Sequence, residues 1–136
     1  MAIVLESPSI HLANSLYEFL TDGDSMNLRT DLDGRYPVSE WHDMVMSSQV
    51  IISDGLPVGT VRIVDDYLGF WVASPHRGTN IAYRSCQLAL AHVNNILEAG
   101  CWVDNLASRR ILARLNFREH HRYSLYGKEA IAWIRD

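Results

Sequence analysis

The chain has 136 residues and a mass of 15.5 kDa, the length of one domain, and 48% of its residues are apolar against 21% charged. This balance supplies a packed core and excludes wholesale disorder, and no apolar run approaches the ~18 residues of a membrane span. A sequence isoelectric point near 5.8 argues against a duplex nucleic-acid binder, which would carry a basic stripe and a high isoelectric point.

The net charge of −4 hides an uneven distribution along the chain. Residues 1–76 hold three Arg and eleven acidic residues, for a charge of −8, whereas residues 77–136 hold eight Arg, one Lys and five acidic residues, for a charge of +4. This division suits a C-terminal half that meets an anionic small ligand and an N-terminal half that faces a cationic or neutral one. A chance distribution over a solvated surface explains it equally well.

Two further features bear on the cellular compartment. Residues 1–6 lack the basic segment and the long apolar segment of a secretory signal, so we expect a cytoplasmic protein. The two cysteines, Cys86 and Cys101, have no metal-ligand spacing, and we expect them to be reduced core residues.

The first half of the chain predicts a strand, two helices and then three consecutive strands. Residues 2–5 form the strand, and the first helix begins with Ser7 as N-cap and Pro8 at the first helical position and ends at Gly23. A polar loop over residues 22–36 leads to a second helix over residues 37–46. The three strands cover residues 50–53, 58–64 and 67–73, with hairpin turns at Asp54-Gly55 and Asp65-Asp66.

The second half predicts two helices that alternate with strands. A break over residues 74–80 precedes a long helix that starts at Ile81 and is closed by Gly100. A short strand over residues 101–103, a helix capped by Asp104 or Asn105, and a final hairpin of residues 117–125 and 129–134 follow. The order β-α-α-β-β-β-α-β-α-β-β predicts one α/β domain over residues 1–136, with a mixed sheet that is parallel where helices cross over.

The most informative segment is the junction between the third consecutive strand and the long helix, Arg77-Gly78-Thr79-Asn80-Ile81-Ala82. A glycine at the entry to a helix lets backbone N–H groups close around an anion, and the helix N-terminus adds positive partial charge. Arg77 adds a charge-assisted contact to a phosphate group. By itself the junction is a weak signal, because many α/β proteins place glycine at such a turn.

A second segment lies downstream, where Asn105 stands at a strand-to-helix corner and Ser108 lies one turn later. On the residues alone, helix capping explains both.

Together, and in this order, the two segments resemble the GCN5-related N-acetyltransferase (GNAT) superfamily. The segment from Arg77 to Ala82 is similar to the family's Arg-Gly-x-Gly-Ile-Ala pyrophosphate loop. Asn105, Ser108, Leu115 and Phe117 are similar to the Asn-x-x-Ser … Leu-Gly-Phe signature of the subgroup that includes the ribosomal-protein N-terminal acetyltransferases. The resemblance covers nearly the whole chain and is closest over residues 58–125.

The resemblance implies that acetyl-CoA, as co-substrate, lies between the strand of residues 67–73 and the strand of residues 101–103. The resemblance implies that the pantetheine arm pairs with backbone groups of Trp71, Val72 and Ala73. It implies that Arg77 and the amides of Gly78, Thr79, Asn80, Ile81 and Ala82 hold the pyrophosphate. The side chains of Asn105 and Ser108 are further implied contacts of the cofactor. An amine-bearing small molecule or peptide N-terminus then attacks the thioester carbonyl directly. The family's final strands often pair into homodimers.

The resemblance leaves the proton-transfer residues open. Many family members place a tyrosine acid seven residues after the asparagine, where this chain has Leu112. Ser108 and Tyr123 are the candidates that replace it. Asp65 or Asp66 is the candidate base, although a hairpin corner explains that pair at least as well. The four Asp residues between Asp22 and Gly34 favour a cationic acceptor.

Three departures from the family pattern support an alternative. Asn80 stands where the loop carries a second Gly or Ala, Pro75 precedes the loop, and the tyrosine acid is absent. Asparagine tolerates positive φ, both here and at Asn116 in place of the closing Gly, but the Asn80 side chain takes space that the pyrophosphate needs. The alternative is a catalytically degenerate acetyltransferase-like fold that serves binding or assembly, as in small, divergent phage-encoded members.

Overall fold

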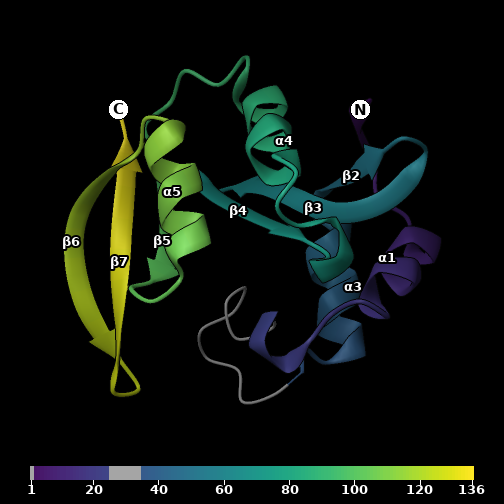
Figure 1. Cartoon of the computed structure of the whole chain (residues 1–136), viewed down its shortest axis with the longest axis horizontal. Helices are drawn as coiled ribbons and strands as arrows, with labels where there is room; N and C mark the ends of the chain where they lie inside the picture. Colours follow the sequence, from purple (N-terminus) through teal and green to yellow (C-terminus); the bar gives the residue numbers. More distant parts are fainter. Residues whose placement is uncertain (1, 25–34) are drawn as a thin grey trace.

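The computed structural model describes residues 2–24 and 35–136 (Figure 1). The elements follow the predicted order: β1 (Ile3–Glu6), α1 (Ile10–Tyr17), α3 (Val38–Met46), β2 (Gln49–Ser53), β3 (Leu56–Val64), β4 (Tyr67–Val72), a 3-10 turn (Ser74–His76), α4 (Ile81–Leu90), β5 (Leu97–Trp102), α5 (Leu106–Arg114), β6 (Arg118–Leu125) and β7 (Lys128–Arg135). The predicted α/β class with a mixed sheet is therefore confirmed.

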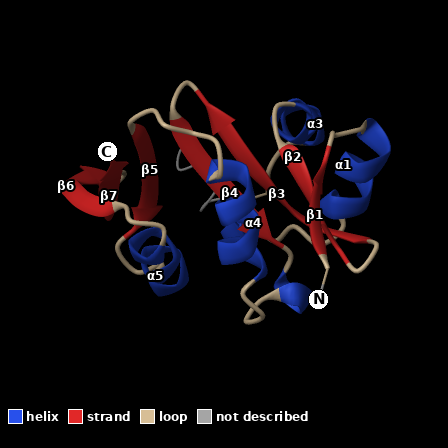
Figure 2. Cartoon of the chain, turned by 90° about the horizontal axis from the view of Figure 1, so that it is seen from above, coloured by secondary structure: helices blue, strands red, loops and turns tan. Residues whose placement is uncertain are grey.

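All seven strands belong to one sheet, in the order β1-β2-β3-β4-β5-β7-β6. Neighbouring strands are antiparallel except β4 and β5, which are parallel. Their ladder has a single register pair among the described residues, Tyr67 with Glu98. Beyond that pair the two strands diverge, and the sheet opens between its two halves (Figure 2).

Helices cover the two faces of the sheet separately. Figure 2 shows α4 and α5 on one face and α1 and α3 on the other. Strand β4 is buried between them: Leu68 and Val72 belong to the core under α4 and α5, and Trp71 belongs to the core under α1 and α3. This double burial is what its near-continuous apolar run predicts.

Trp41 of α3 organises the core under α1 and α3. It is fully buried, its Nε1 donates to the carbonyl of Ala13 at 2.9 Å, and its ring meets that of Trp71 edge-on at a centroid distance of 5.5 Å. An indole with its N–H satisfied can be buried without a polar penalty. Trp41 therefore ties α1 and α3 to the middle of β4.

The predicted start of the first helix and the ends of two helices are wrong. Ser9, not Ser7, caps α1, since its hydroxyl accepts from the Leu12 amide at 3.1 Å, and α1 ends at Tyr17. Residues 22–24 are helical, and residues 25–34 of the predicted loop lie outside the described residues. Helix α4 ends at Leu90, and Gly100 lies inside β5, because alternate residues from Leu97 onward are buried with the period of a strand.

Within residues 2–24 and 35–136, no helix has the length and apolar character needed to cross a membrane.

We expect Gly59→Ala to destabilise the protein. Gly59 of β3 pairs with Val72, and a Cβ at this position would overlap the carbonyl oxygen of Trp71 on the neighbouring strand. Overpacking of this kind lowers the free energy of unfolding by about 1–3 kcal/mol, which urea denaturation measures. Gly69→Ala is the matched control, because its Cβ would have no neighbour within 4 Å. Equal losses in the two variants would contradict this account.

Candidate functional site

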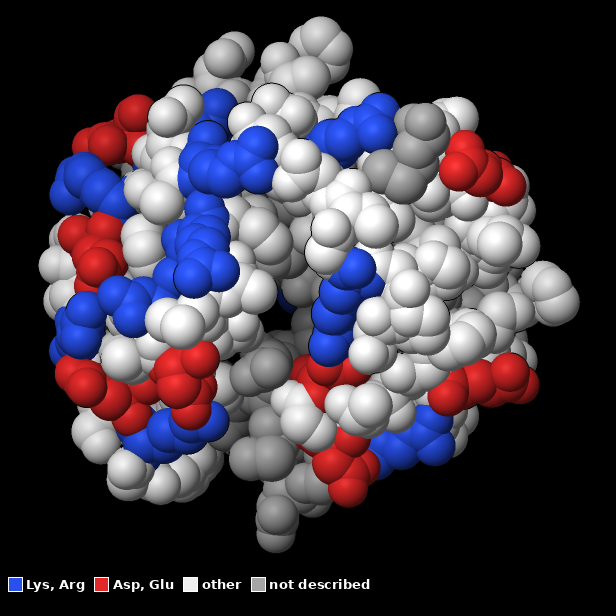
Figure 3. All heavy atoms as spheres, viewed as in Figure 1, with Lys and Arg blue, Asp and Glu red and all other residues white. Residues whose placement is uncertain are grey.

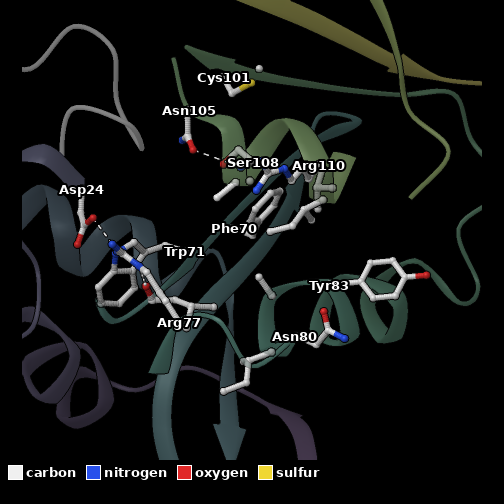
Figure 4. Close-up of a pocket in the computed structure, with 18 of the residues that line it drawn as sticks. Asp24, Phe70, Trp71, Arg77, Asn80, Tyr83, Cys101, Asn105, Ser108 and Arg110 are labelled. Carbon is white, nitrogen blue, oxygen red and sulfur yellow. Dashed lines mark hydrogen bonds and ion pairs between the residues drawn. The ribbon is translucent and has the colours of Figure 1, made fainter. Parts of the chain in front are cut away.

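A cavity of about 720 Å³ lies where β4 and β5 diverge. It has the size of a small-molecule site and appears as a hollow between the two halves of the surface (Figure 3). Every residue of β4 lines it, together with Asp24, His76, Arg77, Gly78, Asn80, Ile81, Ala82, Tyr83, Gly100, Cys101, Asn105, Ala107, Ser108, Arg110, Ile111, Tyr123 and Ala130. Figure 4 shows most of these side chains.

The cavity reaches both faces of the sheet. Successive side chains of a strand point to opposite faces. Trp71 and Val72 of β4 belong to the cores on opposite faces, yet both line the cavity. Gly100 and Cys101, which are neighbours on β5, also both line the cavity. A ligand in the cavity can therefore contact groups on the side of α4 and groups on the side of α1 and α3.

Residues 77–82, the glycine loop, enter the cavity at the start of α4. Gly78 and Asn80 have φ values of 82° and 66°, and Asn116 has a φ of 69°. The prediction that asparagine adopts the left-handed region at both positions is confirmed. The left-handed backbone conformation that favours glycine therefore forms here with asparagine.

The Asn80 side chain contacts an arginine on α5. Its Oδ1 accepts from Nη1 of Arg114 at 2.9 Å, and the Arg114 guanidinium stacks on the ring of Tyr83 at 3.8 Å. Asn80 makes no side-chain cap of α4. Asn80 lines the cavity while its side chain is bonded to Arg114, so the expectation that this side chain takes space the pyrophosphate needs stays a prediction.

Arg77 connects the glycine loop to the N-terminal part of the chain. Its Nε donates to the carbonyl of Val72 at 2.8 Å, and its Nη2 donates to Oδ1 of Asp24 at 2.6 Å (Figure 4). The sequence marked Asp24 as one acid among four in a polar loop, and nothing in its spacing distinguished it. The contact arises because α1 and α3 bring that segment to the end of β4.

Asn105 and Ser108 meet at the start of α5. Asn105 Oδ1 accepts from the Ser108 amide at 3.2 Å, so the capping interpretation is confirmed for Asn105, while Ser108 takes part through its backbone amide. The cap uses the amide oxygen and leaves the NH₂ group as a donor toward a ligand carbonyl. Both side chains line the cavity, as the resemblance implied.

The two cysteines are buried and not disulfide-bonded. Burial raises the pKa of Cys86 to about 12 and also raises the pKa of Cys101. Of the two, Cys101 lines the cavity. It faces a ligand as a neutral thiol, because the thiolate form is penalised by burial.

Tyr67 is a cavity residue that the sequence interpretation missed. Its side chain is 44% exposed, but its hydroxyl lies over Gly100, where a Cβ would be 2.5 Å away. Burial of this end, with contributions from Tyr123 and Cys101, raises the pKa of Tyr67 to about 12. The phenol is therefore a neutral hydrogen-bond donor at neutral pH. The alternation that places Tyr67 on the same face as Trp71 is the signal that could have identified it.

Asp65 and Asp66 do not reach the cavity. Their φ values of 53° and 59° are those of a two-residue hairpin turn between β3 and β4, and Asp66 Oδ1 accepts from Asn95 at 3.2 Å. They precede β4, whereas the glycine loop follows it. This position does not support the predicted role of either residue as the base.

Ala73 and Thr79 also lie outside the lining. The Ala73 amide donates to the carbonyl of Val58 at 2.8 Å, and the Thr79 hydroxyl donates to the carbonyl of His76 at 2.9 Å. The Ala73 amide and the Thr79 hydroxyl are therefore already hydrogen-bonded to backbone carbonyls of the chain. Of the predicted backbone contacts on β4, Trp71 and Val72 remain at the cavity.

Basic side chains gather beside the hollow on the half formed by the C-terminal elements (Figure 3). Helix α5 carries Arg109, Arg110 and Arg114, and Arg110 lines the cavity. Within the described parts of the chain, no group of three or more His, Cys, Asp or Glu residues could hold a metal ion. The positive half of the charge distribution thus lies beside a cavity whose basic lining suits an anionic ligand.

No family model and no curated protein matches the sequence. The fold, in contrast, matches solved acetyltransferases. A GNAT-family acetyltransferase from Bacillus anthracis superposes with a TM-score of 0.81 at 12% identity, over 99% of this chain and 95% of that one. The microcin C7 self-immunity acetyltransferase MccE, solved with acetyl-CoA and AMP, has a TM-score of 0.72 at 18% identity, over 98% and 92% of the two chains.

The similarity extends to a ribosomal-protein acetyltransferase. The Salmonella typhimurium enzyme that modifies the N-terminal serine of the 50S subunit protein L7/L12 has a TM-score of 0.72 at 16% identity, over 99% of this chain and 95% of that one. The chain therefore has the fold of GNAT acetyltransferases, as the resemblance of its two segments implied.

We expect Asn80→Ala to destabilise the protein more than Asn80→Gly. Both variants lose the contact with Arg114, but alanine must also adopt a φ of 66°, at a cost of about 1 kcal/mol. The difference between their free energies of unfolding, measured in urea, gives the cost of the left-handed backbone conformation for alanine relative to glycine. Equal stabilities would contradict the left-handed conformation at residue 80.

Proposed function

We propose that the protein is an acyl-CoA-dependent N-acyltransferase that moves the acetyl group of acetyl-CoA to an amine. The observation that carries this proposal is the cavity between the diverging strands β4 and β5, with the glycine loop and the start of α4 at its edge. An acetyltransferase of the same fold has been solved with acetyl-CoA.

The chemistry of the lining matches the parts of acetyl-CoA. Amides of the glycine loop and the positive end of α4 would hold the pyrophosphate. Arg77 and Arg110, which line the cavity, and Arg114, which is bonded to Asn80, would add positive charge. The pantetheine arm would lie along Trp71 and Val72, with the amide group of Asn105 as a donor. The apolar side chains of β4 would exclude water from the thioester.

In the proposed reaction the acceptor nitrogen attacks the thioester carbonyl, the new C–N bond forms and the C–S bond breaks. The departing thiolate takes a proton, for which Ser108 and Tyr123 are the predicted donors at the cavity. The proton lost by the amine passes to water. Of the carboxylates in residues 2–24 and 35–136, Asp24 lines the cavity and the others do not.

Calorimetric titration with acetyl-CoA tests the proposal. We expect micromolar binding, and Arg77→Ala should weaken it by about 1–3 kcal/mol, the loss of one charge-assisted hydrogen bond. Arg118→Ala is the control, because Arg118 is an exposed β6 residue paired with Asp136 outside the cavity. A protein that does not bind at millimolar acetyl-CoA would contradict the proposal and favour a binding or assembly role.

Direct attack predicts that Cys101 is not acylated. The raised pKa of Cys101 keeps it a neutral thiol, which is a poor nucleophile at neutral pH. After incubation with acetyl-CoA without an acceptor, intact-protein mass spectrometry should show no hydroxylamine-sensitive acetyl group, and Cys101→Ala should retain acetyl-CoA binding. A stoichiometric thioester on Cys101 would instead establish a covalent intermediate.

A further inference from the structure

The carboxylate of Asp24 is a charged group in the cavity that the proposed reaction leaves unused. Its side chain is 8% exposed. Oδ1 accepts from Arg77, whereas Oδ2 is buried and has no hydrogen-bond partner among the residues that the structure describes. A buried carboxylate oxygen without a partner is costly, and structures retain one where a ligand or a conformational change supplies the missing donor.

Asp24 belongs to the segment after α1, whereas the glycine loop leads into α4 on the opposite face of the sheet. Arg77 is the residue that joins the two sides (Figure 4). Trp71, which packs on the side of α1 and α3, lines the cavity as well. The cavity therefore carries an acidic group on its N-terminal side and basic groups on its C-terminal side.

We propose that Asp24 binds a cationic group of the acceptor, and that Arg77 occupies this position until the cofactor binds. The proposal rests on the acyltransferase function proposed above. It assigns the acceptor to a chemical class, amines that are positively charged at neutral pH, and it assigns the recognition to one carboxylate rather than to the overall acidity of the N-terminal half.

Asp24 and the phosphates of the cofactor compete for Arg77, and this competition couples cofactor binding to acceptor binding. The side chain of Arg77 is 46% exposed and stands at the first position of the glycine loop, next to the place proposed for the pyrophosphate. Two phosphate charges attract the guanidinium more strongly than one carboxylate does. When Arg77 turns to the phosphates, Asp24 loses its countercharge, and a cation of the acceptor restores it. A neutral or anionic acceptor would leave a buried, unpaired carboxylate.

Spermidine is the probe for this site, because it is a flexible polyamine cation. We expect spermidine to bind the protein saturated with CoA, and Asp24→Asn, which keeps the shape and removes the charge, to weaken that binding about tenfold or more. Asp22→Asn is the matched control: it removes the same charge two residues earlier in the same helical turn, where the side chain is exposed. This control should bind spermidine within about twofold of the parent.

Each outcome of the titrations decides the inference. Loss of spermidine binding in Asp24→Asn and not in Asp22→Asn supports it. Equal losses in the two variants, or no binding to the parent protein, overturn it. Titration of the same variants with CoA separates this inference from the proposed function: retained CoA binding shows that Asp24→Asn is folded, and failure of the parent to bind CoA contradicts the acyltransferase itself. Asp24→Ser serves as the second variant if Asp24→Asn does not fold.

Arg77→Gln tests the coupling. With the guanidinium removed, Asp24 is free before the cofactor arrives, so spermidine should bind this variant equally well with and without CoA. In the parent protein, CoA should strengthen spermidine binding about tenfold. A parent protein whose spermidine affinity does not respond to CoA would overturn the competition for Arg77.

Discussion

The divergence of the parallel strands β4 and β5 is the constraint on which the site depends. One register pair, Tyr67 with Glu98, joins the two halves of the sheet, and each half is otherwise held by antiparallel ladders and its own helices. Past that pair, the edges of β4 and β5 face a cavity rather than each other. An opening of this kind exposes backbone groups that a ligand can satisfy, so the same feature that weakens the sheet creates the proposed binding site.

Contacts between distant segments then determine the chemistry at this opening. Arg77 reaches Asp24, and Arg114 reaches Asn80, in each case joining the glycine loop to another part of the chain. The uneven charge distribution of the sequence gives the cavity two oppositely charged sides: the arginines of α5 lie on one side and Asp24 lies on the other. This arrangement supports the proposal of an anionic cofactor and a cationic acceptor in the same cavity.

Local sequence features predicted the elements well, whereas of the residues predicted for proton transfer Ser108 and Tyr123 line the cavity and Asp65 and Asp66 do not. The glycine loop, the cap at Asn105 and the hairpin at Asp65-Asp66 follow from short-range preferences of Gly, Asn and Asp, and all three form. Asp65 and Asp66 form that turn and do not line the cavity, and Asp66 instead accepts a hydrogen bond from Asn95. Tyr67 was missed, because strand alternation and not a motif brings it to the cavity. Asp24 was predicted only as one of four acidic residues that favour a cationic acceptor, and its contact with Arg77 depends on segments far apart in the chain.

By itself, the sequence determined the order of elements, the mixed sheet and the position of the glycine loop, since periodicity and turn residues act over a few positions. It also placed asparagine where positive φ is required, at residues 80 and 116. The tertiary structure alone decided where α4 ends and β5 begins, which neighbours contact Arg77 and Asn80, and which acidic residue of the described ranges 2–24 and 35–136 lies at the cavity. These outcomes depend on contacts between segments far apart in the chain, and no local preference specifies such contacts.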